Sequence, residues 1–444
     1  MHHGWMRATS ILLPLCLGAC LQGPPATRLT AHEEVSALLE EISAERIAST
    51  LERLVGFGTR HTMSDTVSET RGIGAARRWI HAEMSRAGEA CDDCLRVRFQ
   101  EFEDTMARHP EAPVVHIVNV LAELPAREPT NRTVVVTGHY DSCVCSLDRW
   151  DATSDAPGAN DDASGTAVVL ELARVFSQRY PEGLQANVLF GAVAGEEQGL
   201  YGSRHLARAL HAEGAEIVAM ITNDVTGNVT AETGAVDSMT LRVFAALPDN
   251  GPARQLARYA WMANRTYQPK FRVDVIERLD RIGRGGDHRP FWAAGDPAVR
   301  FTEKLENYRR QHLPSDVLEH VSPGYVARVA RANAATIVEL ASAPAPPGGL
   351  EMERTDESGG LYWRLSWAAV PGAAGYEVTL RPTTSYTYTR AFVVGDTTEY
   401  LLRAQADDHW VGVRSVAPGG YRSLVASFHP IVPQLGQERF PAVR

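Results

Sequence analysis

A short apolar segment at residues 188–193 is followed closely by two acidic side chains. It reads VLFGAV, and Ala194 and Gly195 separate it from Glu196 and Glu197. An apolar run of this length bounded by glycine is typical of a buried strand in a parallel sheet. Ligands of open α/β sheets bind beyond the carboxyl ends of the strands, and adjacent carboxylates repel each other unless a cation or proton lies nearby. The pattern predicts a strand leading into a binding site; the alternative for so short a motif is a solvated acidic loop.

Similar apolar runs alternate with segments of helical periodicity along most of the chain. Apolar residues at helical spacing predict helices at residues 33–54, 73–87, 166–176, around Leu206 and Leu210, and at 325–341. Apolar or alternating runs predict further strands at residues 95–102, 117–124, 133–137, 217–222 and 297–302. The glycine-rich residues 281–292 predict a loop or turn. This alternation favours an α/β fold with a mostly parallel central sheet and helices on both faces.

The pattern changes after residues 343–349, which read APAPPGG and predict a linker. Short strands without helical periodicity follow at residues 362–367, 375–380, 390–394 and 410–416. We therefore expect an α/β domain at residues 30–342 and a small all-β sandwich at residues 350–430. Within the latter, LSWAAVPGAAGYEV resembles part of a fibronectin type III domain, with Trp367 and Tyr376 as expected core aromatics. Because no candidate catalytic residue lies there, we expect this domain to be dispensable for chemistry.

The N-terminal residues 1–20 have the pattern of a targeting segment. Arg7 precedes an apolar stretch at residues 11–17 that is too short to span a bilayer as a mature helix. The stretch ends in Leu-Gly-Ala before Cys20, which resembles a bacterial lipoprotein signal cleaved before a lipidated cysteine. The alternative is an ordinary signal peptide with an incidental cysteine. Either interpretation predicts an exported protein, attached to the cell envelope through Cys20 or else periplasmic or secreted.

The cysteine content predicts disulfides, and the net charge restricts the class of binding partner. Beyond the targeting segment the cysteines are Cys91, Cys94, Cys143 and Cys145. In an oxidising compartment four cysteines favour two disulfides, for which three pairings are possible. A cysteine-only zinc site is the alternative, but the Cys-x-Cys spacing at Cys143 is unusual for one. The net charge of −10 argues against a nucleic-acid partner.

Histidine and carboxylate side chains recur at the strand ends and in nearby loops. They are His139, Asp161, Glu196, Glu197, Asp224, His288 and His312. Any one of them alone is a weak signal, because a single histidine is more often a surface or core residue than a ligand. Imidazole and carboxylate ligands together suit zinc. Two histidines and three carboxylates are enough for a two-metal site, with one carboxylate left over as a base.

The motifs that contain these residues occur in a recognisable order. GHYDS, GANDDASG, GEEQG, TND, GDH and QHLPSD resemble, over residues 133–341, the co-catalytic di-zinc aminopeptidases of the bacterial leucyl aminopeptidase type. The resemblance implies a peptide substrate and two Zn²⁺ ions per chain. It also implies a role for each site residue: His139 and Asp224 on one zinc, Glu197 and His312 on the other, Asp161 bridging both, Glu196 as general base, and Asp141 orienting His139.

Three features bear on how closely the chain follows this family. His312 is preferred over His288 as the last ligand because it lies in a His-x-Pro-x-Asp stretch. The pair Cys143 and Cys145 is not expected from the family, and a disulfide there would reshape the rim of the pocket. Gln311 stands where the family often has tyrosine, with Tyr308 nearby.

Three arginines also lie near the expected site: Arg281, Arg284 and Arg289. They would either favour an acidic substrate or pair with Asp280 and Asp287, and we expect the pairing.

Two other functions remain open at this point. A glutaminyl cyclase on a similar fold would use like ligands on one zinc for ring closure. An exported binding lipoprotein would use a catalytically inactive peptidase scaffold to bind a ligand. Two complete ligand sets argue against the first, and the presence of Glu196 argues against the second.

Overall fold

The centre of the fold is an eight-stranded sheet with the strand order β1-β2-β4-β3-β5-β8-β6-β7. The structure is a computed structural model that describes Met1 and residues 29–355, 362–404 and 406–429. The strands of the sheet are β1 (Arg96–Thr105), β2 (Val114–Leu124), β3 (Arg132–His139), β4 (Asn187–Val193), β5 (Glu216–Asn223), β6 (Thr240–Phe244), β7 (Arg272–Ile276) and β8 (Ala298–Glu303).

The middle of this sheet is parallel and buried. Strands β4, β3, β5 and β8 are parallel neighbours, and β7 is parallel to β6. The pairs β1–β2, β2–β4 and β6–β8 are antiparallel. Every residue of β3 after Arg132 is buried, as in a strand that is covered on both faces. The prediction of a mostly parallel sheet is confirmed, and the apolar run at residues 188–193 lies inside it as part of β4.

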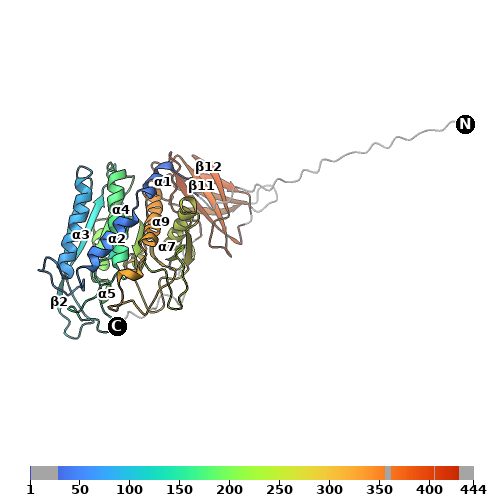
Figure 1. Cartoon of the computed structure of the whole chain (residues 1–444). Coiled ribbons are helices and arrows are strands. Elements are labelled where there is room, and N and C mark those ends of the chain that lie inside the picture. Colours follow the sequence, from blue (N-terminus) through green and yellow to red (C-terminus); the bar gives the residue numbers. More distant parts are fainter. Residues whose placement is uncertain (2–28, 356–361, 405, 430–444) are drawn as a thin grey trace.

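Helices cover both faces of the sheet (Figure 1). They are α1 (Glu33–Glu40), α2 (Ala44–Val55), α3 (Gly72–Glu89), α4 (Ala163–Arg179), α5 (Glu196–Gly199), α6 (Tyr201–Ala212), α7 (Pro252–Tyr267), α8 (His288–Ala294), the 3₁₀ turn η1 (Leu318–His320) and α9 (Pro323–Ala341). Val134 and Val136 of β3 belong to the core that contains α4 and α9, whereas Val135 packs with Leu206 of α6 and Phe291 of α8. Because neighbouring side chains of a strand point to opposite faces, these two clusters lie on opposite sides of the sheet.

Two local expectations are wrong. Residues 33–54 form two helices instead of one, because Ser43 caps α2 by accepting a hydrogen bond from the Arg46 amide. A serine in this position satisfies a backbone donor at a helix start, and so begins a new helix. Residues 281–292 are not all loop, since α8 begins at His288.

The C-terminal part consists of two antiparallel sheets, with the orders β13-β10-β9 and β12-β11-β14-β15. Their strands are β9 (Glu351–Thr355), β10 (Tyr362–Ser366), β11 (Gly375–Pro382), β12 (Arg390–Gly395), β13 (Glu399–Leu402), β14 (His409–Val416) and β15 (Ala426–Ser427). Trp367 and Tyr376 are buried in their shared core, with ring centroids 5.5 Å apart. The expectation that both are core aromatics is confirmed.

Partly buried polar contacts join these sheets to the α/β part of the chain. The carboxylate of Asp249 accepts hydrogen bonds from Arg258 of α7 and from Arg381 of β11. The hydroxyl of Tyr259 donates to the Arg422 carbonyl at 2.8 Å. The two parts are therefore joined by a packed interface as well as by the linker.

The predicted signal segment, residues 1–20, lies outside the described residues apart from Met1. Among the helices that the structure describes, none is both long and apolar enough to cross a bilayer. The lipidation of Cys20 stays a prediction.

Candidate metal centre

The predicted site residues gather at the edge of the sheet where the parallel strands end. His139 is the last residue of β3, Asp224 directly follows β5, and Glu197 lies in α5 shortly after β4. Asp161 precedes α4, and His312 lies in the loop between β8 and η1. Because parallel strands share one carboxyl edge, the fold brings these distant segments together.

The first ligand group consists of His139, Asp161 and Asp224. One ligand atom of each lies within 4.8 Å of the others, and all three residues are buried. His139 Nε2 is 3.3 Å from Asp161 Oδ1 and 3.9 Å from Asp224 Oδ1. Within the described residues this buried nitrogen has no hydrogen-bond partner. Buried polar atoms are normally paired, so an unpaired imidazole nitrogen facing two carboxylates fits a cation site.

The second ligand group consists of Asp161, Glu197 and His312, whose ligand atoms also lie within 4.8 Å of one another. His312 Nε2 is 3.1 Å from both Asp161 Oδ2 and Glu197 Oε2. Asp161 belongs to both groups and presents one oxygen to each histidine. The buried Oε1 of Glu197 lacks a hydrogen-bond partner in the part of the chain that the structure describes. This donor set fits two neighbouring metal ions that share Asp161.

Opposite charges dominate the titration of the second group. Against the effect of burial, the carboxylates of Glu197 and Asp161 raise the pKa of His312 to about 11. Burial also opposes the shift of Asp161, but His139 and His312 hold its pKa well below the ordinary value. A metal ion binds neutral imidazole, so metal binding at His312 must release a proton. Metal affinity here is therefore expected to fall as the solution becomes more acidic.

Asp141 contacts both His139 and the turn that carries the two glutamates. Its carboxylate accepts the backbone amides of Glu196 at 3.3 Å and Glu197 at 3.2 Å. His139 Nδ1 lies 3.1 Å from the Asp141 carbonyl and 3.5 Å from its carboxylate Oδ1. A hydrogen bond that fixes the proton on Nδ1 leaves Nε2 as the ligand atom. These contacts suit a residue that orients its neighbours.

Glu196 lies beside the two ligand groups and is a member of neither. Burial and the charges of Asp224, Asp287 and Glu197 raise the pKa of Glu196 well above its ordinary value, although His139 opposes the shift. A carboxylate with a raised pKa holds a proton more readily than an ordinary carboxylate, which suits a group that accepts and returns a proton. The position and the pKa of Glu196 therefore fit a general base.

Two buried side chains that are not among the predicted site residues hold the loop that carries Asp161. Asp316 accepts the backbone amides of Asn160 and Asp161, both at 2.9 Å. Arg60 donates to the Gly158 carbonyl at 2.9 Å, and burial lowers its pKa to about 10, so it stays charged at neutral pH. Asp316 lies in the QHLPSD motif, whereas Arg60 lies in no motif that would have identified it.

Arg300 of β8 is a further supporting residue that the sequence did not indicate. It is fully buried, with Nη2 2.6 Å from Asp224 Oδ1 and Nη1 3.2 Å from Asp280 Oδ2. The expected pairing of Arg281 with Asp280 is present. Asp287 forms no ion pair with an arginine among the residues described.

Arg284 and Arg289 do not pair with acidic residues in the described chain, so the expected pairing is wrong for both. Arg284 Nη1 instead donates to Gln311 Oε1 at 2.8 Å, and its Nη2 lies 3.3 Å from His312 Nε2. Tyr308 is 52% exposed, with its ring centroid 5.8 Å from the Arg284 guanidinium carbon. Gln311 and Arg284, and not Tyr308, are therefore in hydrogen-bond contact around His312.

His288 lies outside both ligand groups. Its Nε2 is 2.7 Å from the Leu279 carbonyl, and burial lowers its pKa to about 4. The sequence-based preference for His312 agrees with this placement.

Replacing the two histidines separately should give different metal contents. We expect His312→Ala to lose about one metal ion per chain, since it removes one ligand from a site of about four. His288→Ala should keep both ions, although it removes a buried side chain. Metal analysis of the two purified variants checks this, and loss of metal from His288→Ala alone would reverse the assignment.

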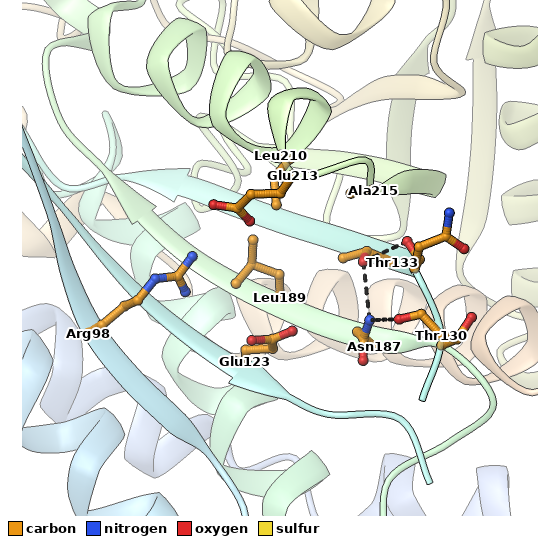
Figure 2. A pocket seen from close by; sticks show the side chains of 10 residues that line it. Arg98, Glu123, Thr130, Thr133, Asn187, Leu189, Leu210, Glu213 and Ala215 are labelled. Atoms are coloured by element: carbon orange, nitrogen blue, oxygen red, sulfur yellow. Dashed lines mark hydrogen bonds between the residues drawn. The ribbon is translucent and has the colours of Figure 1, made fainter. Parts of the chain in front are cut away.

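A separate pocket of about 170 Å³ lies at the opposite edge of the sheet, near the starts of β3 and β4 (Figure 2). Asn187 Nδ2 donates there to the Thr130 carbonyl and to Thr133 Oγ1. Arg98, Glu123 and the other lining residues include none of the predicted site residues. The pocket is therefore distinct from the metal centre.

Comparison with known proteins identifies the family to which this arrangement belongs. The model of peptidase family M28 matches residues 119–337, which include both ligand groups. A probable zinc metalloprotease from Leptosphaeria maculans is 40% identical over 425 residues, covering 89% of this chain and 97% of the relative. Another from Pyrenophora teres f. teres is 38% identical over 422 residues, covering 88% and 86%.

Solved structures share the fold at low sequence identity. LapA aminopeptidase from Legionella pneumophila superposes with a TM-score of 0.54 at 20% identity, covering 76% of this chain and 80% of LapA. Glutaminyl cyclase from Bacteroides thetaiotaomicron gives a TM-score of 0.52 at 15% identity, covering 67% and 98%. The fold is thus common to both activities. The relatives matched over nearly their whole length, together with the family model, show that this chain belongs to peptidase family M28.

Proposed function

We propose that the chain is an exported aminopeptidase that removes N-terminal residues from peptides at a pair of zinc ions. The observation that carries the proposal is the pair of ligand groups joined by Asp161, with Glu196 beside them. A hydrolase with two metal ions needs this combination: two neighbouring ligand sets and a separate base.

The donor set supports zinc as the metal. His139 and Asp224 would hold one ion, Glu197 and His312 the other, and Asp161 both. Imidazole and carboxylate are common zinc ligands, and the relatives carry the name zinc metalloprotease. When bound, the two ions would supply Lewis acidity that lowers the pKa of a water molecule and polarises the scissile carbonyl.

The protein's own contribution is proton transfer and positioning. Glu196 takes the proton of the attacking water and passes it to the leaving amine. Asp141 holds the backbone of Glu196 and Glu197, so that the base and the ligand keep a fixed relation. Placement at strand ends gives these groups rigid support.

The two other functions predict different reactions. A glutaminyl cyclase is the second candidate because that enzyme class shares the fold. Two ligand groups, where the cyclase interpretation needs one zinc, favour hydrolysis. A binding protein on the same scaffold would have no need of a base at Glu196.

Three substrates separate these functions. We expect the purified protein to release the amine from leucyl anilide and to leave N-acetyl-leucyl anilide intact, because an aminopeptidase requires a free amino terminus. Cleavage of the acetylated compound would indicate an endopeptidase. Ring closure of a glutaminyl peptide would indicate a cyclase, and no turnover of any substrate would leave only binding.

We further propose that the C-terminal sheets are a fibronectin type III-like domain that stabilises the enzyme without taking part in chemistry. A chain that ends at residue 349 should fold and cleave small substrates with unchanged kcat/KM. It should also melt at a lower temperature, because Asp249 and Tyr259 lose hydrogen-bond partners at the interface, and one such bond contributes roughly 0.5–1.5 kcal/mol to stability. Calorimetry and an anilide assay measure both effects. A shortened chain that folds but is inactive would place the C-terminal sheets in the site.

We also propose that the mature protein begins at a lipidated Cys20, on the pattern of residues 1–20. Mass spectrometry of the mature N-terminus tests this, and an unmodified terminus elsewhere contradicts it.

A further inference from the structure

The loop at residues 140–149 leaves the carboxyl end of β3 and lies against the second ligand group. A disulfide joins Cys143 to Cys145 within it. Cys143, Cys145 and Glu197 each have a sulfur or carboxylate oxygen within 4.8 Å of those of the other two. The disulfide is therefore a direct neighbour of a metal ligand.

The same loop bonds to the backbone on both sides of this group. The Ser146 amide donates to the His312 carbonyl at 3.2 Å, and its hydroxyl donates to the Gln311 carbonyl at 3.4 Å. Arg149 Nη1 donates to the Glu197 carbonyl at 2.7 Å. The loop position therefore affects the backbone position of two metal ligands at once.

The conformation of His312 makes such support necessary. Its φ is +56°, in the left-handed region that non-glycine residues rarely adopt. A residue persists in this region where its surroundings hold it there. Ser146, directly after Cys145, supplies one of the contacts that hold His312.

We propose that the Cys143–Cys145 disulfide is a positioning element for the metal ion held by Glu197 and His312, and that its reduction loosens this ion selectively. A ring closed between residues two apart leaves the backbone little freedom, which keeps Ser146 against His312. The inference rests on the proposed function for its meaning in catalysis. The disulfide makes the enzyme sensitive to thiol reductants at one of its two metal sites.

The reduction step is an ordinary thiol–disulfide exchange. A dithiol attacks one sulfur, and two electrons and two protons pass to the protein disulfide. The bond between Cys143 and Cys145 breaks, two thiols form, and the dithiol closes to its own disulfide. In an oxidising compartment the protein disulfide stays closed.

The disulfide between Cys91 and Cys94 provides a matched control. Cys91 and Cys94 are also close in sequence, and they are bonded just after α3. Neither belongs to a metal-ligand group among the residues described. A general effect of removing a short-range disulfide should appear at both pairs, whereas a positioning effect should appear only at Cys143 and Cys145.

The test compares metal release from wild type, the double variant Cys143→Ser/Cys145→Ser, and the control Cys91→Ser/Cys94→Ser. Zinc release to a competing chelator gives the affinity of each of the two ions. We expect the first variant to weaken one ion by about 10–100-fold, the range found when a residue supporting a metal ligand is changed. The other ion should be unaffected, and the control should match wild type. Excess zinc should restore kcat in the first variant.

Two further samples identify the affected metal site. They also keep the proposal testable if the Cys143→Ser/Cys145→Ser protein fails to fold. Combined with His312→Ala, the double serine change should add no further loss, because both act on the same ion. Dithiol treatment should weaken one ion in wild type and in the control. In the Cys143→Ser/Cys145→Ser protein it should have no further effect, which excludes simple chelation by the dithiol.

Several results would overturn the inference. These are unchanged affinity for both ions in the Cys143→Ser/Cys145→Ser protein, an equal loss in the control, or a gain of metal by reduced wild type. Absence of peptide hydrolysis with the expected pattern of metal release would instead refute the proposed function and leave this inference standing.

Discussion

Glu196→Gln should retain both zinc ions and the wild-type melting temperature but lose most activity. Glu196 lies outside both ligand groups, and glutamine keeps its shape while being unable to accept a proton. Loss of a general base lowers the rate typically by ~10²–10⁴-fold, which corresponds to roughly 3–5 kcal/mol at the barrier. Because no ligand is removed, added zinc should not restore kcat. Metal analysis, calorimetry and kcat on one preparation measure all three properties.

Glu197→Ala is the matched comparison, because Glu197 is expected to be a metal ligand, whereas Glu196 is expected to be the base. It removes a ligand of the second group, so metal occupancy should fall at one site and excess zinc should restore part of the activity. Loss of zinc from Glu196→Gln together with its retention in Glu197→Ala would exchange the two roles. Full activity of Glu196→Gln would refute proton transfer by this residue.

Asp161→Ala should have a larger effect on metal content than any other single ligand change. Asp161 Oδ1 faces His139 and Oδ2 faces His312, so the substitution removes a ligand from both groups at once. Changing residues that merely support a ligand costs about 10–100-fold in metal affinity, and we expect loss of this ligand to exceed ~100-fold for each ion. Zinc per chain after dialysis, with kcat at saturating zinc, measures the effect.

Asp224→Ala is the control for this result, since Asp224 belongs to the first group alone. It should lose one ion and keep the other. If Asp161→Ala also keeps one ion at wild-type affinity, Asp161 does not bridge the two sites, and the pair of groups would have to be reinterpreted.

The sequence predicts the parallel core well because its strands are buried on both faces. Strands β3, β4 and β5 read as almost uninterrupted apolar runs, and their ends carry the polar residues of the site. The grouping of the site residues can be predicted from these strands, because parallel strands share one carboxyl edge of the sheet. Asp161 and His312 lie in loops, and their motifs rather than any periodicity indicate them.

Other helices and strands cannot be predicted from the sequence, because polar residues interrupt their apolar pattern. Helix α7 buries Arg254 and Arg258, whose charges are balanced by ion pairs with Asp249. Neither α7 nor its flanking strands is predicted from the sequence. Arg60 and Arg300 support the site through contacts with residues far away in sequence. Such roles depend on tertiary packing, and no local pattern encodes them.

The pairing of the cysteines shows a similar limit. Spacing and compartment predict two disulfides but leave three pairings possible. The structure bonds Cys91 to Cys94 and Cys143 to Cys145, the two pairs that are nearest in sequence. The contact of the second pair with Glu197 follows only from the fold.

Zinc content measured together with amine release from leucyl anilide, before and after chelation, tests the two-metal mechanism most directly. We expect two zinc ions per chain in the purified protein, no hydrolysis once a chelator has removed them, and recovery when zinc is returned. His139, Asp161, Glu197, Asp224 and His312 together provide the ligands for this stoichiometry. Undiminished hydrolysis by a sample verified to be free of metal would contradict the mechanism.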